Sequence, residues 1–239
     1  MSDRFALVTG GGVRLGRAIC DGLAEDGFGV AVHFNNSERE ARETVAALTQ
    51  RGHHAVAVQG DLSEAKVCAD VVARVLNKFG ALDVVVNSAA SFTSTRLGET
   101  SPDDWDDIFA LNTRAPFLIA QAAAPHLREG GAIVNIADLA GIQAWPSYVA
   151  HGASKAALIH LTRSLARSLG PRVRVNAIAP GAVLLPAGYS AKAADRLVRE
   201  TPLGRLGEPA DVVNAVKYLI DAPFVTGSLV VVDGGRSVR

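Results

Sequence analysis

Short apolar runs alternate with longer amphipathic segments along almost the whole chain. The amphipathic segments repeat their apolar residues at the three- and four-residue spacing of a helix face, which distinguishes them from the short runs. The runs predict strands at residues 5–8, 30–34, 55–59, 82–86, 132–136, 173–178 and 229–232. Strands that alternate with helices imply parallel pairing through right-handed crossovers. We therefore expect one α/β domain over residues 1–239, a doubly wound seven-stranded parallel sheet with helices on both faces.

Two helix starts and two prolines refine this pattern. Ser37 and Glu40 have the spacing of a capping box, which predicts that a helix opens there. Ser101 precedes a proline and two acidic residues, a sequence typical of a capped helix N-terminus. Pro116 and Pro125 fall inside the helix that follows and are expected to bend or interrupt it.

The last third of the chain combines a long helix, a loop and a shorter helix. The apolar spacing predicts helices at about 147–169 and at 209–220. Between the sixth strand and the second of these helices, residues 182–208 show no strand pattern and are expected to form a loop over the substrate.

A glycine-rich stretch, Thr9-Gly10-Gly11-Gly12-Val13-Arg14-Leu15-Gly16, joins the first strand to the first helix. Glycines permit positive φ and place no Cβ between the loop amides and a phosphate, and the helix N-terminus adds unpaired N–H groups. A dinucleotide pyrophosphate would bind there. The strict Gly-x-Gly-x-x-Gly spacing is not met, because one residue too many separates Gly12 from Gly16 and Arg14 stands where another glycine is expected. A plain tight turn remains the alternative.

Polar and small residues follow most of the other predicted strands. Ligands of doubly wound sheets bind outside the carboxyl ends of the strands, so these residues are expected to converge on one rim. The candidates are Asn35, Asn36, Ser37, Asp61, Leu62, Asn87, Ala89, Phe92, Asp138, Pro180 and Gly181.

The end of the second strand bears on the choice of cofactor. An NAD-dependent enzyme tends to place a carboxylate there for the ribose 2′-OH, whereas this chain has Asn35, Asn36 and Ser37, with no acid before Glu38. A 2′-phosphate would meet amide and hydroxyl donors, which favours NADPH; the alternative is that these are only turn residues. Asp61 either accepts from the adenine amine or merely caps a helix.

Composition narrows the classes of partner. Hydrophobic residues make up 49% of the 239 residues, charged residues 20%, and the formal net charge is +0, so we expect a small-molecule substrate and no nucleic acid. Cys20 and Cys68 form neither a disulfide framework nor a metal motif, which is typical of a reducing cytosol. No signal peptide and no apolar stretch of membrane-spanning length is found, so we expect a cytoplasmic protein without membrane contact.

Taken in order, a set of motifs along the chain resembles the short-chain dehydrogenase/reductase family, which implies a Rossmann fold and a nicotinamide cofactor. The motifs are Thr9-Gly10-x-x-x-Arg14-x-Gly16, Asn87-Ser88-Ala89-Ala90, Asn112, Asp138, Lys155, Pro180-Gly181 and Asp233-Gly234-Gly235. Arg14, Asp138 and Phe92 are similar to residues of the pteridine reductase group. That resemblance implies a flat substrate ring between the nicotinamide and Phe92, with Arg14 shared between the pyrophosphate and the ring edge.

One position departs from the family pattern. The family's proton donor is the tyrosine of Tyr-x-x-x-Lys, and counting back from Lys155 that position is His151. A free imidazole titrates near ~6.5 and a phenol near ~10. Lys155 would lower the pKa of His151 while Asp138 would raise it, so an Asp138–His151 pair is a candidate proton source. Tyr148 either relays a proton or only packs in the pocket.

The resemblance assigns the remaining roles. It implies that Lys155 holds the nicotinamide ribose, that Asn112 holds a water and lysine network, and that the long helices form a homotetramer. The leading hypothesis is an NADPH-dependent reductase of a pterin or similar flat heterocycle. One alternative is a carbonyl reductase acting on 3-oxoacyl or sugar ketones. Another is an NADPH-binding subunit that lacks activity because of His151 and pairs with a paralogous chain.

Overall fold

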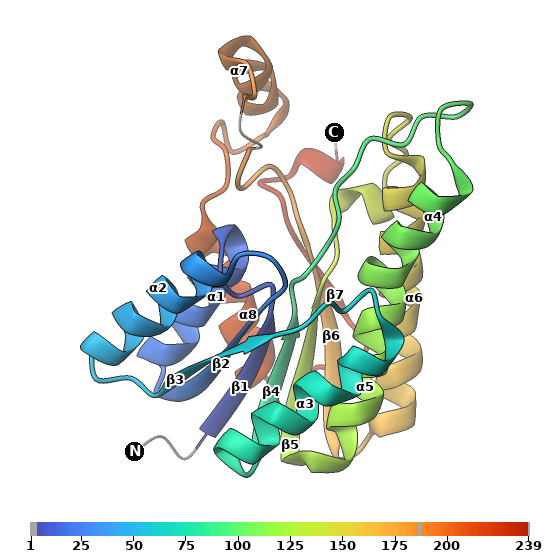
Figure 1. Cartoon of the computed structure of the whole chain (residues 1–239). Helices are drawn as coiled ribbons and strands as arrows, with labels where there is room; N and C mark the ends of the chain where they lie inside the picture. Colours follow the sequence, from blue (N-terminus) through green and yellow to red (C-terminus); the bar gives the residue numbers. More distant parts are fainter. Residues whose placement is uncertain (1–3, 186–187, 239) are drawn as a thin grey trace.

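The computed structural model describes residues 4–185 and 188–238, which form a parallel sheet with helices on both faces (Figure 1). Over these residues the seven strands lie in the order β3-β2-β1-β4-β5-β6-β7, all paired in parallel. Their bounds are β1 Arg4–Thr9, β2 Phe28–Phe34, β3 Ala55–Gln59, β4 Leu82–Asn87, β5 Leu127–Ile136, β6 Val173–Pro180 and β7 Leu229–Val232. The predicted strands and the doubly wound sheet are confirmed.

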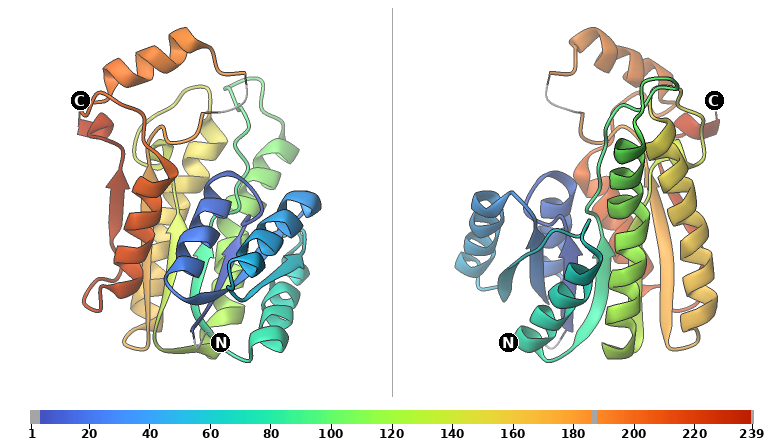
Figure 2. Two further views of the ribbon diagram at one scale, coloured as in Figure 1. Left: turned by 90° about the vertical axis from the view of Figure 1, so that its left-hand side faces the viewer. Right: turned by 45° about the vertical axis from the view of Figure 1, so that its right-hand side comes forward.

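The helices form two layers around the sheet, as the two further views show (Figure 2). One layer holds α1, α2 and α8, and the other holds α3, α5 and α6, while α4 continues the second layer beyond the sheet (Figure 1). Their bounds are α1 Arg14–Glu25, α2 Glu38–Gln50, α3 Ala65–Phe79, α4 Pro102–Phe109, α5 Ala115–Ala123, α6 Val149–Leu169, α7 Ala191–Glu200 and α8 Pro209–Asp221.

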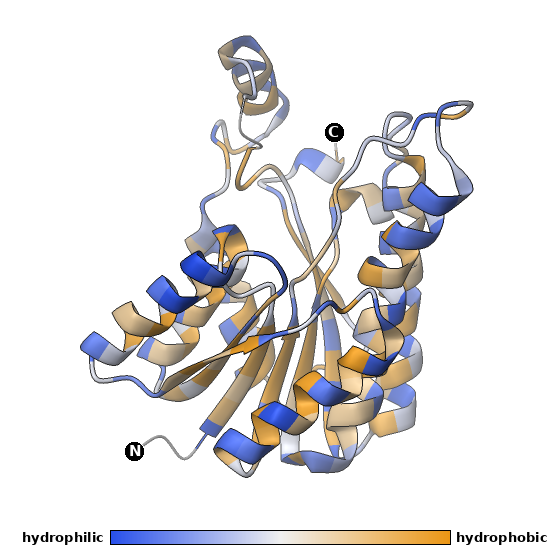
Figure 3. Cartoon of the chain, viewed as in Figure 1, coloured by the Kyte–Doolittle hydropathy of each residue, from blue (hydrophilic) through white to orange (hydrophobic). Residues whose placement is uncertain are grey.

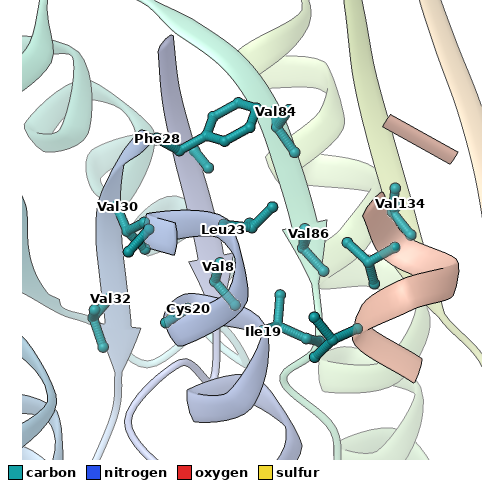
Figure 4. Packing of buried hydrophobic residues seen from close by; sticks show 14 of the residues in the cluster. Val8, Ile19, Cys20, Leu23, Phe28, Val30, Val32, Val84, Val86 and Val134 are labelled. Atoms are coloured by element: carbon teal, nitrogen blue, oxygen red, sulfur yellow. The ribbon is translucent and has the colours of Figure 1, made fainter. Parts of the chain in front are cut away.

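Two apolar cores lie on the two faces of the sheet. On the side of α1 and α8, Val8 and Val86 of the central strands pack with Ile19 and Leu23 of α1 (Figure 4). The other core joins the opposite face of the same strands to α3, α5 and α6. Strands covered on both faces must be apolar throughout, which explains the continuous apolar runs of the sequence and the orange centre of Figure 3.

The strand order also fixes where a ligand can bind. The chain moves outward from β1 through β2 to β3, then returns to place β4 on the other side of β1. Connections that leave β1 and β4 therefore diverge, and they open a crevice at the carboxyl ends of these strands. All the sequence motifs that follow strand ends meet at this edge.

The helix-start predictions have different outcomes. The expected cap at Ser101 is confirmed, and Asp104 completes a capping box that was not predicted. Pro116 cannot donate a backbone hydrogen bond, and the helix opens into a π turn at Ala110–Arg114 (η1) just before it, as expected of an interrupted helix. The helix predicted to open at Ser37 is confirmed, because α2 begins at Glu38, but the capping box does not form. Within the described residues the Ser37 side chain caps no N–H group, because its ψ of 55° lies outside the extended range, and Glu40 pairs with Arg39 instead.

The expected substrate loop contains a helix that the sequence reading missed. Helix α7 lies within residues 182–208 and stands beyond the carboxyl edge of the sheet (Figure 1). Ser190 caps it by accepting from the Ala193 N–H, and Arg196 pairs with Glu200 one turn later. These two features are ordinary helix signals, and they were readable from the sequence. No helix in the described part of the chain is both long and apolar enough to cross a membrane.

Candidate active site

A cavity of about 1050 Å³ opens at the carboxyl edge of the sheet. It is large enough for a dinucleotide together with a small substrate. The sequence-predicted residues that line it are Gly10, Arg14, Leu15, Gly16, Asn35, Asn36, Ser37, Asp61, Leu62, Ala89, Phe92, Asp138, Tyr148, His151, Lys155, Pro180 and Gly181. The expected convergence on one rim is therefore observed.

Three predicted site residues lie behind the cavity wall instead. The Thr9 hydroxyl accepts hydrogen bonds from the backbone N–H groups of Ser88 and Ala89, which ties the glycine loop to the end of β4. Asn87 donates to Asn135 in the buried sheet. Asn112, in the π turn, exchanges two hydrogen bonds with the Ser91 backbone at 2.8 and 3.0 Å. Thr9 and Asn112 shape the wall by fixing backbone, and the Asn112 amide also contacts the side chains of Ser154 and His151.

The glycine loop leaves the close approach that a pyrophosphate needs. Gly10 has a φ of +66°, and a Cβ there would lie 3.0 Å from the Ala89 Cα. A Cβ on Gly16 would lie only 2.0 Å from the Gly10 carbonyl oxygen, so the first turn of α1 packs directly on the loop. Together with the N-terminus of α1, this geometry fits a dinucleotide phosphate.

His33 supports the same loop and was missed in the sequence. Its Nδ1 accepts from the Gly10 N–H at 3.2 Å, and its Nε2 donates to the Gly60 carbonyl at 2.9 Å. Burial lowers the pKa of His33 to about 4, so the ring is neutral and can accept at one nitrogen while donating at the other. A lone polar residue within the otherwise apolar second strand was the signal in the sequence.

Arg14 connects the glycine loop to the chain that covers the cavity. Its guanidinium donates to the Leu184 carbonyl at 2.7 Å and approaches the Leu185 carbonyl at 3.4 Å. Its φ of +52° lies in the left-handed region, which explains why glycine is the residue expected at this position. Arg14 lines the cavity, so a role toward a phosphate or a substrate ring stays a prediction.

A pair of variants separates these two properties of Arg14. Arg14→Ala removes the contact to Leu184 but keeps a Cβ on a residue in the left-handed region. Arg14→Gly removes the contact and the Cβ. We expect Arg14→Gly to be the more stable variant by about 1 kcal/mol, the cost of the left-handed conformation. Urea unfolding of both proteins measures the difference. Equal free energies of unfolding would show that the backbone at residue 14 relaxes.

The corner expected to hold a 2′-phosphate contains mostly uncharged donors. Asn35, Asn36 and Ser37 all line the cavity. Glu40 lines it as well, which was not predicted from the sequence. A backbone hydrogen bond, and then the Arg39 guanidinium at 2.9 Å, hold the pKa of this carboxylate low. Asp61 accepts from both the N–H and the hydroxyl of Ser63, so it organises a turn at the cavity edge.

Lys155 lies at the base of the cavity and is 3% exposed. Its ammonium donates to the Ile136 carbonyl at 2.8 Å. Burial lowers the pKa of Lys155 to about 8, and the negative charge of Asp138 opposes this shift. The Lys155 ammonium can therefore lose its proton at a pH close to neutral.

His151 lies beside Lys155 with one ring nitrogen held and the other available. Nδ1 lies 3.0 Å from the Ser91 carbonyl and 3.4 Å from the Asn112 amide nitrogen, and the shorter contact, to an acceptor, favours a proton on Nδ1. Nε2 is buried, has no hydrogen-bond partner in the described part of the chain, and lies 3.7 Å from Asp138 Oδ2. The other Asp138 oxygen accepts from the Ala140 N–H, which fixes the carboxylate. In the Asp138–His151 pair, the proton that can be exchanged is therefore the one on His151 Nε2.

An aromatic wall borders this pair. The rings of Phe92 and Tyr148 stack with centroids 4.4 Å apart, and Phe92 meets the His151 ring edge to face at 4.8 Å. Phe92 remains 46% exposed, so part of its ring faces the cavity. Tyr148 precedes α6 and packs against Phe92, the expected alternative to a proton relay. Trp145 and Arg236 extend the wall; Arg236 directly follows the Asp233-Gly234-Gly235 motif, whereas no motif in the sequence pointed to Trp145.

Comparisons with known proteins agree with this architecture. Residues 12–237 match the family described as enoyl-(acyl carrier protein) reductase. The 3-oxoacyl-(acyl-carrier-protein) reductase FabG of Staphylococcus aureus is 33% identical, over 97% of each chain. The crystal structure of FolM alternative dihydrofolate reductase 1 from Brucella canis, complexed with NADP, has a TM-score of 0.94 and 32% identity, and the alignment covers 100% of this chain and 95% of that one.

A third similar protein is a blue fluorescent protein from a metagenomic library, solved in complex with NADPH. It has a TM-score of 0.93 and 34% identity, with 98% of each chain covered. The family match and the relatives above 30% identity span nearly the whole chain. The chain therefore belongs to the short-chain dehydrogenase/reductase family of oxidoreductases.

Proposed function

We propose that this protein is an NADPH-dependent reductase of a pterin or a similar flat heterocycle. The observation that carries the proposal is the buried Nε2 of His151, which has no hydrogen-bond partner within residues 4–185 and 188–238 and lies 3.7 Å from Asp138, beside the partly exposed Phe92 ring. A flat ring placed against Phe92 would bring a ring nitrogen toward this proton source. The similarity to the Brucella FolM protein supports the same substrate class.

The cofactor site divides between the loop that follows β1 and the base of the cavity. The Gly10–Gly16 loop would hold the pyrophosphate, Asn36 and Ser37 the 2′-phosphate, and Lys155 the nicotinamide ribose. NADPH, when bound, supplies the hydride. The protein itself orients the substrate ring on Phe92 and moves the proton.

Proton delivery would pass through Nε2 of His151. The Ser91 carbonyl keeps a proton on Nδ1, so protonation of the neutral ring occurs at Nε2, and Asp138 stabilises the resulting imidazolium. The imidazolium then donates to the substrate nitrogen as the hydride arrives. Lys155 lies behind the pair and can restore the proton.

Steady-state oxidation of NADPH tests the proposal. We expect the purified chain to oxidise NADPH with dihydrobiopterin or dihydrofolate between pH 5 and pH 8, and to do so faster than with a 3-oxoacyl thioester or a sugar ketone. No oxidation with either dihydropterin across that range would contradict the proposal.

Carbonyl reduction is the second candidate, because the similar Staphylococcus protein is named as a 3-oxoacyl reductase. Asp138 argues against it. A ketone oxygen that gains negative charge needs a neutral or positive donor, whereas a carboxylate at this position would repel it. Faster turnover of ketones than of dihydropterins would favour this candidate.

The preference for NADPH gives a separate prediction. Asn36→Asp places a carboxylate beside the proposed 2′-phosphate of NADPH. In NADH, the same carboxylate can accept a hydrogen bond from the ribose 2′-OH. We expect the ratio of kcat/KM for NADPH over NADH to fall at least about tenfold, the effect of ~1.4 kcal/mol of charge repulsion. Asn36→Ala is the control for loss of the amide alone. An unchanged ratio in Asn36→Asp would place the 2′-phosphate elsewhere.

We also propose that the chain assembles as a homotetramer. This proposal rests on the family resemblance, and light scattering of the purified protein measures it directly.

A further inference from the structure

Among the described residues that line the cavity, Arg236 is the one arginine that the proposed reaction leaves without a role. It begins the short 3₁₀ turn Arg236–Val238 (η4) and lines the same cavity as His151. Asp233 fixes this turn, because its carboxylate accepts from the backbone N–H groups of Gly235 and Ser237. The side chain of Arg236 is only 21% exposed.

The guanidinium of Arg236 lacks a hydrogen-bond acceptor among the described residues. The nearest carboxylate, Glu200 of α7, lies 3.9 Å away, beyond hydrogen-bond distance. Glu200 instead binds Arg196 at 2.7 Å. The unused donors are not fully buried, since among the described residues only His151 Nε2 is a buried polar atom without a partner, so a ligand that accepts from Arg236 would gain hydrogen bonds without breaking one within the protein.

A path of aromatic rings connects Arg236 to the proposed proton donor. The Arg236 guanidinium lies 5.8 Å from the centre of the Trp145 ring, and Trp145 meets Tyr148 at 6.2 Å. Tyr148 stacks on Phe92, which meets His151. A substrate whose reducible ring lies at His151 can therefore extend along aromatic side chains until it reaches Arg236.

Resting on the proposed function, we infer that the substrate carries a carboxylate on a tail, and that Arg236 binds this carboxylate at the far end of the aromatic wall. The guanidinium fork matches two carboxylate oxygens. A phosphate dianion fits less well, because the Glu200 carboxylate would repel its second charge. Arg236 thus selects among heterocycles that react equally well at His151.

The test compares two dihydropterins that share the reducible ring. Dihydrofolate carries a glutamate tail, and dihydrobiopterin carries a neutral side chain. Because a hydrogen bond to a charged group is worth about 1.5–3 kcal/mol, Arg236→Gln is expected to lower kcat/KM for dihydrofolate about 10- to 100-fold and to leave dihydrobiopterin within about twofold. Arg236→Lys should fall between wild type and Arg236→Gln.

Controls separate this role from a structural one. Arg167→Gln, an exposed arginine in the last turn of α6, should change neither substrate. Equal losses for both dihydropterins in Arg236→Gln, or no loss for either, would overturn the inference. A dihydropterin with a phosphorylated tail that depends on Arg236 as strongly as dihydrofolate would overturn the choice of a carboxylate.

A binding measurement keeps the inference distinct from the proposed reaction. Calorimetric titration of the NADP-loaded protein with oxidised folate and with biopterin needs no turnover. Tighter binding of folate that is lost in Arg236→Gln would support the carboxylate site even if the protein reduces neither substrate. Equal affinities in both proteins would overturn the site, whatever the outcome of the activity assay.

Discussion

Replacing His151 with phenylalanine is expected to lower kcat for dihydropterin reduction about 100- to 10,000-fold, the usual contribution of a positioned proton donor. Phenylalanine keeps the ring volume and the contact with Phe92, but it removes Nε2, the buried nitrogen 3.7 Å from Asp138. Stopped-flow measurement of NADPH oxidation gives kcat, and NADPH binding measured by fluorescence should be unchanged. A kcat close to that of the wild type would remove His151 from the mechanism.

His151→Tyr tests the same role by pH. The donor at residue 151 is an imidazolium in the wild-type enzyme and a phenol in His151→Tyr. A phenol retains its proton to higher pH than an imidazolium. The rate of His151→Tyr should therefore begin to fall at a higher pH than the rate of the wild-type enzyme. If the two profiles coincide, a group other than residue 151 donates the proton.

Replacing Lys155 with methionine is expected to lower kcat/KM about 100-fold or more, since the ribose contact and the proton reserve behind His151 are both lost. KM for NADPH should rise as well, because the lysine holds the cofactor. Steady-state kinetics with varied NADPH separates the two effects. Unchanged KM together with unchanged kcat would show that the lysine is only structural.

The same variant tests the pKa of Lys155 through stability. The folded pKa is lowered to about 8, whereas an unfolded lysine keeps its ordinary value near 10.5. Between these values the unfolded state binds more protons than the folded state, so the free energy of unfolding rises with pH through this window. At and below neutral pH the buried charge destabilises the apoprotein.

We expect the difference in unfolding free energy between wild type and Lys155→Met to change by about 3 kcal/mol at most between pH 8 and pH 10.5, in favour of the wild type at high pH. Subtracting the variant removes the contribution of other groups that titrate in this range. A difference that stays constant with pH would contradict the lowered pKa.

The sheet and most of the site could be predicted from local patterns. Each strand is a short apolar run because helices cover both of its faces, and a residue that follows a strand end is carried to the rim by the parallel topology. Asp138 and His151 could be paired for this reason, although they come from different elements. The glycine loop could be placed because its geometry depends on adjacent residues.

What could not be predicted depends on contacts between distant segments. Arg236 follows the end of β7 and is carried to the rim like other residues after strand ends, but no spacing in the sequence relates it to Trp145. The contact from Arg14 to Leu184 likewise joins residues 170 positions apart. The failure at Ser37 has a different origin, since a backbone ψ of 55° and the pairing of Glu40 with Arg39 override the local capping signal.

A single-turnover experiment tests the central claim most directly. The isolated chain, in excess over NADPH, is mixed with dihydropterin, and NADPH loss and tetrahydropterin formation are followed together. We predict that one tetrahydropterin forms for each NADPH consumed, with no second protein present. NADPH that binds tightly and remains unoxidised until a paralogous chain is added would contradict the account and identify a cofactor-binding subunit instead.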